Sequence, residues 1–284
     1  IGDYVGALRA NGLQPDTFLP EYGPRQYEIT VDPALALQAA DEAVKLREIG
    51  RSVAKKHGYH LTFSPVVTRG IVGNGVHIHF SLIDKDGNPV MYDPAGPGKL
   101  SPVGASFAAG ILKHGRAISA IAAPSAISYE RLKPHSWSAY YLNLADRDRE
   151  ALLRICPYPE VEGVNVAKRY NIEFRGADAT ASPYLQLAML IHAGLEGIRA
   201  SLPAPYLSSG DPGTLSQAER DARGIGDLPR SLPEALQALE EDSVAMGWLG
   251  PVLSKAYLIH KRGEISMSEG IDIDELCRIY ARAY

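Results

Sequence analysis

The sequence has only two cysteines, Cys156 and Cys277, among its 284 residues. They lie far apart and each is surrounded by apolar residues, so the pattern favours two reduced, buried thiols over a disulfide or a pair of metal ligands. No run of about eighteen apolar residues occurs, so the sequence predicts no membrane span. These absences together are typical of a cytoplasmic protein.

An excess of charge of one sign is also missing. The formal net charge is -4 and the isoelectric point is near 6.1, which argues against a nucleic-acid partner or an anionic membrane partner. The motifs of serine hydrolases, phosphate-binding loops, zinc fingers and dinucleotide-binding folds are absent as well. Any catalytic chemistry must therefore rest on other residues.

The composition is that of an ordinary globular protein, 45% hydrophobic and 22% charged. The length suits one large domain or two. The chain opens on Ile1 rather than Met and enters a short amphipathic helix from Tyr4 to Ala10. This beginning favours a fragment that lacks an upstream domain over a processed chain.

The stretch from Val72 to Leu82 is the most informative part of the chain. It opens on a glycine-rich turn and then alternates between apolar and polar residues, as a strand with two different faces does. One face carries two imidazoles and a hydroxyl, which predicts either a solvent-facing strand or the wall of a site. The polar residues are His77, His79 and Ser81, and the apolar ones are Val76, Ile78, Phe80 and Leu82.

Two further segments alternate in the same way. Residues 26–31 place Glu28 on a polar face, with Glu21 just before the strand, and residues 169–175 place Asn171, Glu173 and Arg175 together. Parallel strands buried on both faces read as continuous apolar runs, and these do not. The sequence therefore predicts an α+β fold with an antiparallel, curved sheet, a polar front and long helices behind it.

Other segments complete the predicted fold. Strands are expected at 59–67, 138–145 and 151–155, and residues 203–231 are expected to form a long surface excursion rich in Pro, Gly and Ser. Asp32-Pro33 and Ser101-Pro102 have the chemistry of helix starts. Helices are expected at 32–58, 101–122, 182–200, 232–241, 251–260 and 271–283.

The polar faces together suggest a phosphoryl-transfer site. Carboxylates and a histidine suit a hard cation such as Mg²⁺ or Mn²⁺, and arginines on the same sheet suit phosphate or carboxylate oxygens. Each residue alone is more often solvated or structural, and the cluster Arg147-Asp148-Arg149 is more often a surface ion-pair cluster. Only the combination favours a site, and spacing leaves open whether the faces converge.

At these residues the chain resembles the glutamine synthetase family over nearly its whole length, 1–284, as a single catalytic domain. The resemblance rests on six motifs in the family's order. They are Glu21-Tyr-Gly-Pro-Arg-Gln-Tyr-Glu28, Gly73-Asn-Gly-Val-His-Ile-His-Phe-Ser81, Ser128-Tyr-Glu-Arg131-Leu, Arg147-Asp-Arg149 followed by Arg154, Asn171-Ile-Glu-Phe-Arg175, and Asp178-Ala-Thr-Ala-Ser-Pro-Tyr-Leu185.

The resemblance implies an ATP-dependent ligase that joins glutamate to an amine or ammonia through a γ-glutamyl phosphate. Carried over by motif, Glu21 and Glu28 would hold one Mg²⁺ or Mn²⁺, and His77 and Glu173 a second. The nucleotide pocket would include His79, Ser81 and Lys168. The phosphoryl group and the amino-acid substrate would be bound by Arg131, Arg149, Arg154 and Arg175.

The chain departs from the family pattern at positions that bear on the amine. Trp137 stands where the family has a glutamate that binds ammonium, and a Trp offers a π face to a cation or stacks on an alkyl chain. We therefore expect an organic amine, although a mobile loop residue without a substrate role is an equal alternative for Trp137. Val72 replaces an asparagine, Asn171 an arginine, and Leu19-Pro20 a histidine.

The family also implies what this chain alone would lack. Its members are homo-oligomeric rings whose active sites include a neighbour's N-terminal β-grasp domain, which has no counterpart here, so the chain alone is expected to be inactive. Two alternatives stay open: an ordinary glutamine synthetase that uses ammonia, and a non-catalytic homologue that serves as a binding or assembly module. The carboxylate and arginine cluster argues against the last, because a scaffold has no need of costly like charges.

Overall fold

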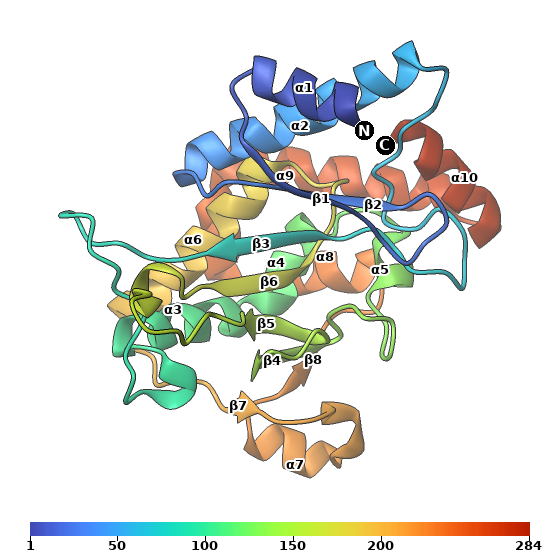
Figure 1. The fold of residues 1–284 in the computed structure, drawn as a ribbon. Coiled ribbons are helices and arrows are strands. Elements are labelled where there is room, and N and C mark those ends of the chain that lie inside the picture. Colours follow the sequence, from blue (N-terminus) through green and yellow to red (C-terminus); the bar gives the residue numbers. More distant parts are fainter.

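The computed structural model describes residues 1–284 and has an α+β fold (Figure 1). The strands are β1 (Pro15–Pro20), β2 (Tyr27–Val31), β3 (Val76–Phe80), β4 (Tyr141–Asp146), β5 (Ala151–Ile155), β6 (Ile172–Ala177), β7 (Leu207–Ser208) and β8 (Gly226–Asp227). The α-helices are α1 (Gly2–Ala10), α2 (Ala36–Lys56), α3 (Pro102–Lys113), α4 (Gly115–Ala122), α5 (Ser128–Arg131), α6 (Pro183–Arg199), α7 (Gln217–Ala222), α8 (Leu232–Glu241), α9 (Ser243–Ser268) and α10 (Ile273–Ala283).

The main sheet is mixed rather than purely antiparallel. It has six strands in the order β3-β6-β5-β4-β7, with β8 paired to β4. The β3, β6 and β5 strands are antiparallel as predicted, but β4 runs parallel to β5 and β7. The connection 147–150 runs back from the end of β4 to the start of β5, and Arg147 adopts φ 60° where the chain leaves β4. The short connection thus joins a parallel pair of strands where an antiparallel sheet was predicted.

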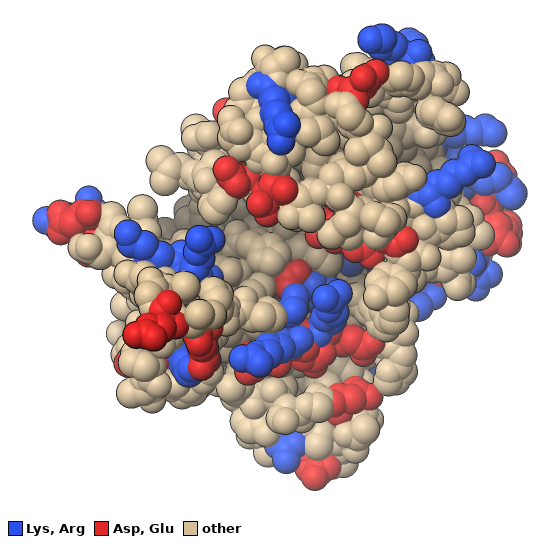
Figure 2. All heavy atoms as spheres, viewed as in Figure 1, with Lys and Arg blue, Asp and Glu red and all other residues tan.

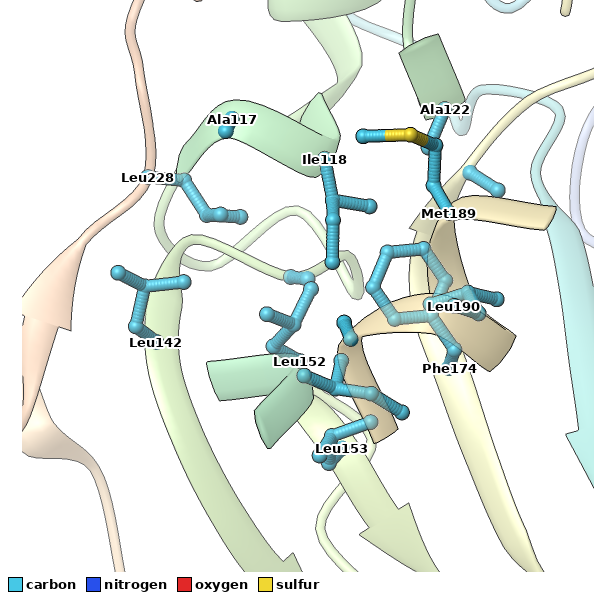
Figure 3. Packing of buried hydrophobic residues seen from close by; sticks show 14 of the residues in the cluster. Ala117, Ile118, Ala122, Leu142, Leu152, Leu153, Phe174, Met189, Leu190 and Leu228 are labelled. Carbon is cyan, nitrogen blue, oxygen red and sulfur yellow. The ribbon is translucent and has the colours of Figure 1, made fainter. Parts of the chain in front are cut away.

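The hydrophobic core lies between this sheet and the helices behind it, as predicted. In Figure 1 helices α3, α4, α6 and α8 lie on one side of the sheet and leave the other side open. Figure 3 shows Leu142 of β4, Leu152 of β5 and Phe174 of β6 pointing toward Ile118 of α4 and Met189 of α6. The apolar face of each strand is thus buried behind the sheet, which leaves its polar face for the open front.

Several predicted segments differ from the structure. Helix α2 begins at Ala36, with Leu35 at the N-cap, rather than at Asp32-Pro33. Residues 59–67 form no strand, and β4 begins at Tyr141 rather than at 138. The predicted helix 101–122 is two helices, α3 and α4, because the chain turns at buried His114, whose ring nitrogen Nδ1 lies 2.6 Å from Asp242 Oδ2.

The C-terminal half also holds differences. The excursion 203–231 contains two short strands, β7 and β8, which extend the main sheet beside β4, and helix α7. The predicted helix 251–260 is part of the longer helix α9, which bends at Gly250 before Pro251. No helix of the protein combines the length and the apolar character needed to cross a membrane.

Candidate active site

Glu173 lies at the centre of the polar front of the sheet. It is opposite His79 of β3 on one side and Arg154 of β5 on the other, so three neighbouring strands present these side chains in one row. The side chain of Glu173 is 2% exposed. A carboxylate buried this deeply must be paired, since an isolated buried charge is very costly.

Positive and polar groups surround the Glu173 carboxylate. The Nη1 atoms of Arg154 and Arg175 donate hydrogen bonds to its two oxygens at 2.9 Å and 2.5 Å. The ring atom Nδ1 of His77 lies 3.2 Å from Oε1, and Nε2 of His79 lies 3.7 Å from it. Burial alone would raise the pKa of Glu173, but His77, Arg175, His79 and Arg154 outweigh burial and lower it. Glu173 is therefore ionised at neutral pH.

Two of the arginines are themselves held in place by backbone oxygens. Arg175 donates from Nε to the carbonyl of Arg149 at 2.8 Å, and Arg131 donates from Nη2 to the carbonyl of Ala177 at 2.8 Å. Burial lowers the pKa of Arg131 to about 10, so it stays charged at neutral pH. The side chain of Arg149 is exposed, but its positive charge helps to lower the pKa of Arg175. Four arginines thus give the front of the sheet a fixed positive charge.

The carboxylates of Glu21 and Glu28 meet at the same place. Strands β1 and β2 form an antiparallel pair that ends at Pro20 and Tyr27, which brings Glu21 back toward Glu28. Burial, a hydrogen bond to Glu21 and repulsion from Glu21 and Glu173 raise the pKa of Glu28. A bound divalent cation would stabilise the ionised form of this carboxylate pair, because the cation supplies the missing countercharge.

The donor set fits Mg²⁺ or Mn²⁺. Glu21, Glu28 and Glu173 supply carboxylate oxygens, and His77 supplies an imidazole. Burial and the charges of Arg175 and Arg131 lower the pKa of His77 to about 3, so its ring is neutral at working pH and has a free lone pair for a metal. The polar faces, whose convergence the spacing left open, thus come together in the structure. Which ligand each residue binds stays a prediction.

The glycine turn before β3 lies against Arg131. A Cβ on Gly75 would lie 2.9 Å from Arg131 Nη1, and a Cβ on Gly73 would lie 2.9 Å from its Cγ, so neither position has room for a side chain. Gln26 joins this turn to the β1–β2 pair by donating to the carbonyl of Gly73 at 2.9 Å. One amide thereby fixes the Glu21–Glu28 pair relative to His77.

Three predicted residues lie outside this cluster or at its edge. Ser81 and Lys168 are exposed, and no hydrogen bond or ion pair joins their side chains to the cluster. Trp137 lies in the loop between α5 and β4, where its carbonyl accepts a 3.4 Å hydrogen bond from Arg175 Nη2. Figure 2 shows basic and acidic side chains gathered beside a hollow on the open front of the sheet.

Cys156 is a site residue that sequence reasoning missed. Both cysteines are free and buried as predicted, but Cys156 Sγ lies 3.4 Å from Nδ1 of His79 and 3.9 Å from Oε2 of Glu173. Burial raises the pKa of Cys156 to about 12. The signal was available, because Cys156 directly follows β5 and comes two residues after Arg154, a spacing that favours the same side of the sheet. Asn171, a departure from the family pattern, binds the same imidazole, with Oδ1 3.0 Å from His79 Nδ1.

Comparison with known proteins agrees with this geometry. The family model of the glutamine synthetase catalytic domain matches residues 1–275. The chain is 36% identical to the gamma-glutamylpolyamine synthetase GlnA3 of Streptomyces coelicolor, over 99% of this chain and 60% of that protein. It is 38% identical to the glutamine synthetase of Pyrococcus furiosus, over 88% of this chain and 54% of that protein.

Solved structures show the same fold. A crystal structure of a novel glutamine synthase homolog superposes with a TM-score of 0.88 at 44% identity, over 100% of this chain and 62% of that one. A GmaS/ADP complex superposes with a TM-score of 0.80 at 26% identity, over 98% of this chain and 63% of that one. The chain spans little more than half the length of the curated relatives named here. It belongs to the glutamine synthetase family and matches that family's catalytic domain.

Proposed function

We propose that this domain catalyses the ATP-dependent joining of glutamate to an organic amine. A γ-carboxylate oxygen of glutamate attacks the γ-phosphorus of ATP and ADP leaves. The neutral amine nitrogen then attacks the acyl carbon, the bond from carbon to the phosphate oxygen breaks, phosphate leaves, and the nitrogen gives up one proton to form the amide. The observation that carries the proposal is the buried ion-pair cluster of Glu173, Arg154 and Arg175 beside the Glu21–Glu28 pair.

Each part of the cluster has a role in this reaction. Glu21 and Glu28 would hold one divalent cation and His77 and Glu173 the second, and the cations when bound would neutralise phosphate charge. Arg154 and Arg175 are fixed before substrate arrives, so they need no reorganisation to stabilise developing charge. Arg131 and Arg149 complete the positive wall. His79, Ser81 and Lys168 would line the nucleotide pocket.

The choice of an organic amine rests on Trp137. It stands in the loop where the family has a carboxylate for ammonium, and its backbone is held by Arg175 at the cluster. The similarity to a relative named for γ-glutamylpolyamine synthesis supports the same choice. An ordinary glutamine synthetase is the second candidate, favoured by the relatives of that name. Assembly into a homo-oligomeric ring is part of the proposal.

An amine screen tests the proposal. The full-length natural protein is incubated with ATP, Mg²⁺ and glutamate, and phosphate release is measured for ammonia and for a series of primary amines. We expect the highest kcat/KM with an organic amine. Ammonia as the best acceptor would make the protein a glutamine synthetase. If the protein binds neither Mn²⁺ nor ATP, that result would instead favour a non-catalytic module.

A further inference from the structure

Tyr22 and Trp137 form an aromatic pair at the rim of the cluster. Their ring centroids are 4.5 Å apart and their planes meet at 78°, an edge-to-face contact. Tyr22 directly follows Glu21, whereas Trp137 comes from the loop more than a hundred residues later. The two residues are 69% and 52% exposed, although they touch each other. Their remaining ring surface is free to contact a ligand.

The pair is held in place by the arginines of the cluster. Arg175 donates to the Trp137 carbonyl, and Arg131 donates to the hydroxyl of the next residue, buried Ser138, at 3.0 Å. Trp137 itself has φ 53°, a left-handed conformation that a residue other than glycine adopts only where its surroundings impose it. The ring is therefore presented by a fixed backbone, which reduces the entropy lost on binding.

The site has a buried floor and a solvent-exposed rim. Glu173 and Arg175 are 1% and 4% exposed, so the reacting groups of the substrates must lie at the floor. The aromatic pair lies at the solvent side of the loop that Arg175 anchors. A small acceptor such as ammonia would not need this surface. A longer amine whose nitrogen reaches the floor would place its other end against the two rings.

We infer that Tyr22 and Trp137 form a rim site that binds a positively charged tail of the amine substrate. This inference rests on the proposed function and adds Tyr22 as a specificity residue. The faces of aromatic rings attract ammonium groups. The attacking nitrogen must lose its charge before it reacts, so attraction to that nitrogen would stabilise its unreactive form. A distal ammonium keeps its charge throughout, and attraction to it persists into the transition state.

The rim site predicts a specific order of acceptors. Cation–π contacts contribute about 0.5–2 kcal/mol each, so loss of one ring corresponds to a weakening of roughly two- to thirty-fold. We compare 1,4-diaminobutane with n-butylamine, which has the same chain length without the second charge. The wild type is expected to have a KM for the diamine at least about five-fold below that for the monoamine.

The test uses the full-length protein and the variants Tyr22→Ala, Tyr22→Phe and Trp137→Ala. Each alanine variant is expected to raise the KM for the diamine by about ten-fold, with little change in kcat. Tyr22→Phe keeps the aromatic ring and is expected to have the wild-type KM for the diamine. Tyr59→Ala is the matched control, because Tyr59 is 71% exposed and lies in the segment after α2, away from the cluster.

A binding measurement separates this inference from the proposed function. Trp137 is one of only two tryptophans, so fluorescence titration with 1,4-diaminobutane, with Trp137→Phe as a reference, reports binding without turnover. Diamine binding that weakens in Tyr22→Ala supports the rim site even if ammonia is the better acceptor. An enzyme that uses organic amines but shows no preference for the diamine, and no change in Tyr22→Ala, would overturn the rim site and leave the proposed function standing. Absence of diamine binding in the wild type would also overturn it.

Discussion

Replacing Glu173 by Gln removes the negative charge at the centre of the cluster with almost no change in shape. Arg154 and Arg175 then lose their shared countercharge, and their side chains are only 12% and 5% exposed. Removing one partner of a buried ion pair costs about 3–5 kcal/mol, because the other charge stays buried without compensation. Gln still offers one oxygen to accept a hydrogen bond, so we expect the lower part of that range for the metal-free protein, about 3 kcal/mol.

The size of this loss matters because a protein of this kind has about 5–15 kcal/mol of stability in all. Urea unfolding at pH 7 with a chelator present measures it directly. The double variant Glu173→Gln, Arg175→Met is the internal control, because removing both members of a buried pair is often close to neutral. We expect the double variant to recover more than half of the loss. A cost below about 1 kcal/mol for Glu173→Gln would refute the reasoning, since that is the value of an exposed ion pair.

The same variant gives a pH dependence of known sign. The pKa of Glu173 is lowered in the folded protein, so its contribution to stability is complete above its unfolded pKa, about 4.3. That contribution is lost as the pH falls through the lower folded pKa. The wild type should therefore lose stability relative to Glu173→Gln below about pH 4.3. A stability difference that is constant from pH 7 to pH 3 would contradict the pairing.

Three further predictions concern other parts of the site. Glu28→Gln should stabilise the metal-free protein at pH 7, because the raised pKa of Glu28 means that its ionisation costs stability as pH rises. The same variant should weaken Mn²⁺ binding. Urea unfolding checks the first effect and a Mn²⁺ titration checks the second. Gly75→Ala should cost about 1–3 kcal/mol and lower kcat, because its Cβ would displace Arg131. Gly6→Ala, in helix α1 with nothing within 4 Å, is a control that adds a Cβ without displacing a neighbour. Cys156, with its pKa raised to about 12, should resist iodoacetamide at pH 7.5 in the folded protein and react after unfolding, as mass spectrometry would show.

The alternation of polar and apolar residues predicted the front of the sheet well. Because side chains in a strand have a period of two, the polar face was predicted correctly, and the structure brings its members together: His77, His79, Glu173 and Arg175. The α+β class and the helices behind the sheet followed from the same pattern. That Glu21 and Glu28 would share one site was implied by the family resemblance, and their carboxylates do interact in the structure.

The sequence was less informative where long-range contacts decide the structure. A polar residue of β6 taken alone suggested a solvated side chain, yet Glu173 is only 1% exposed, and periodicity does not reveal that burial. The parallel pairing of β4 and β5 depends on the path of four connecting residues. The contact of Tyr22 with Trp137 joins segments that share no local signal. At the break between α3 and α4, His114 contacts Asp242, which lies between α8 and α9 and is far away in the sequence.

In the proposed reaction, the cluster transfers a phosphoryl group to glutamate and then an acyl group to an amine. The most direct test uses glutamate labelled with ¹⁸O in its γ-carboxylate, together with ATP, Mg²⁺ and 1,4-diaminobutane, and the full-length protein. Mass spectrometry of the phosphate measures the label. We expect one labelled oxygen in each phosphate released, formed in step with a γ-glutamyl amide. Unlabelled phosphate, released by attack of water on ATP, would contradict it.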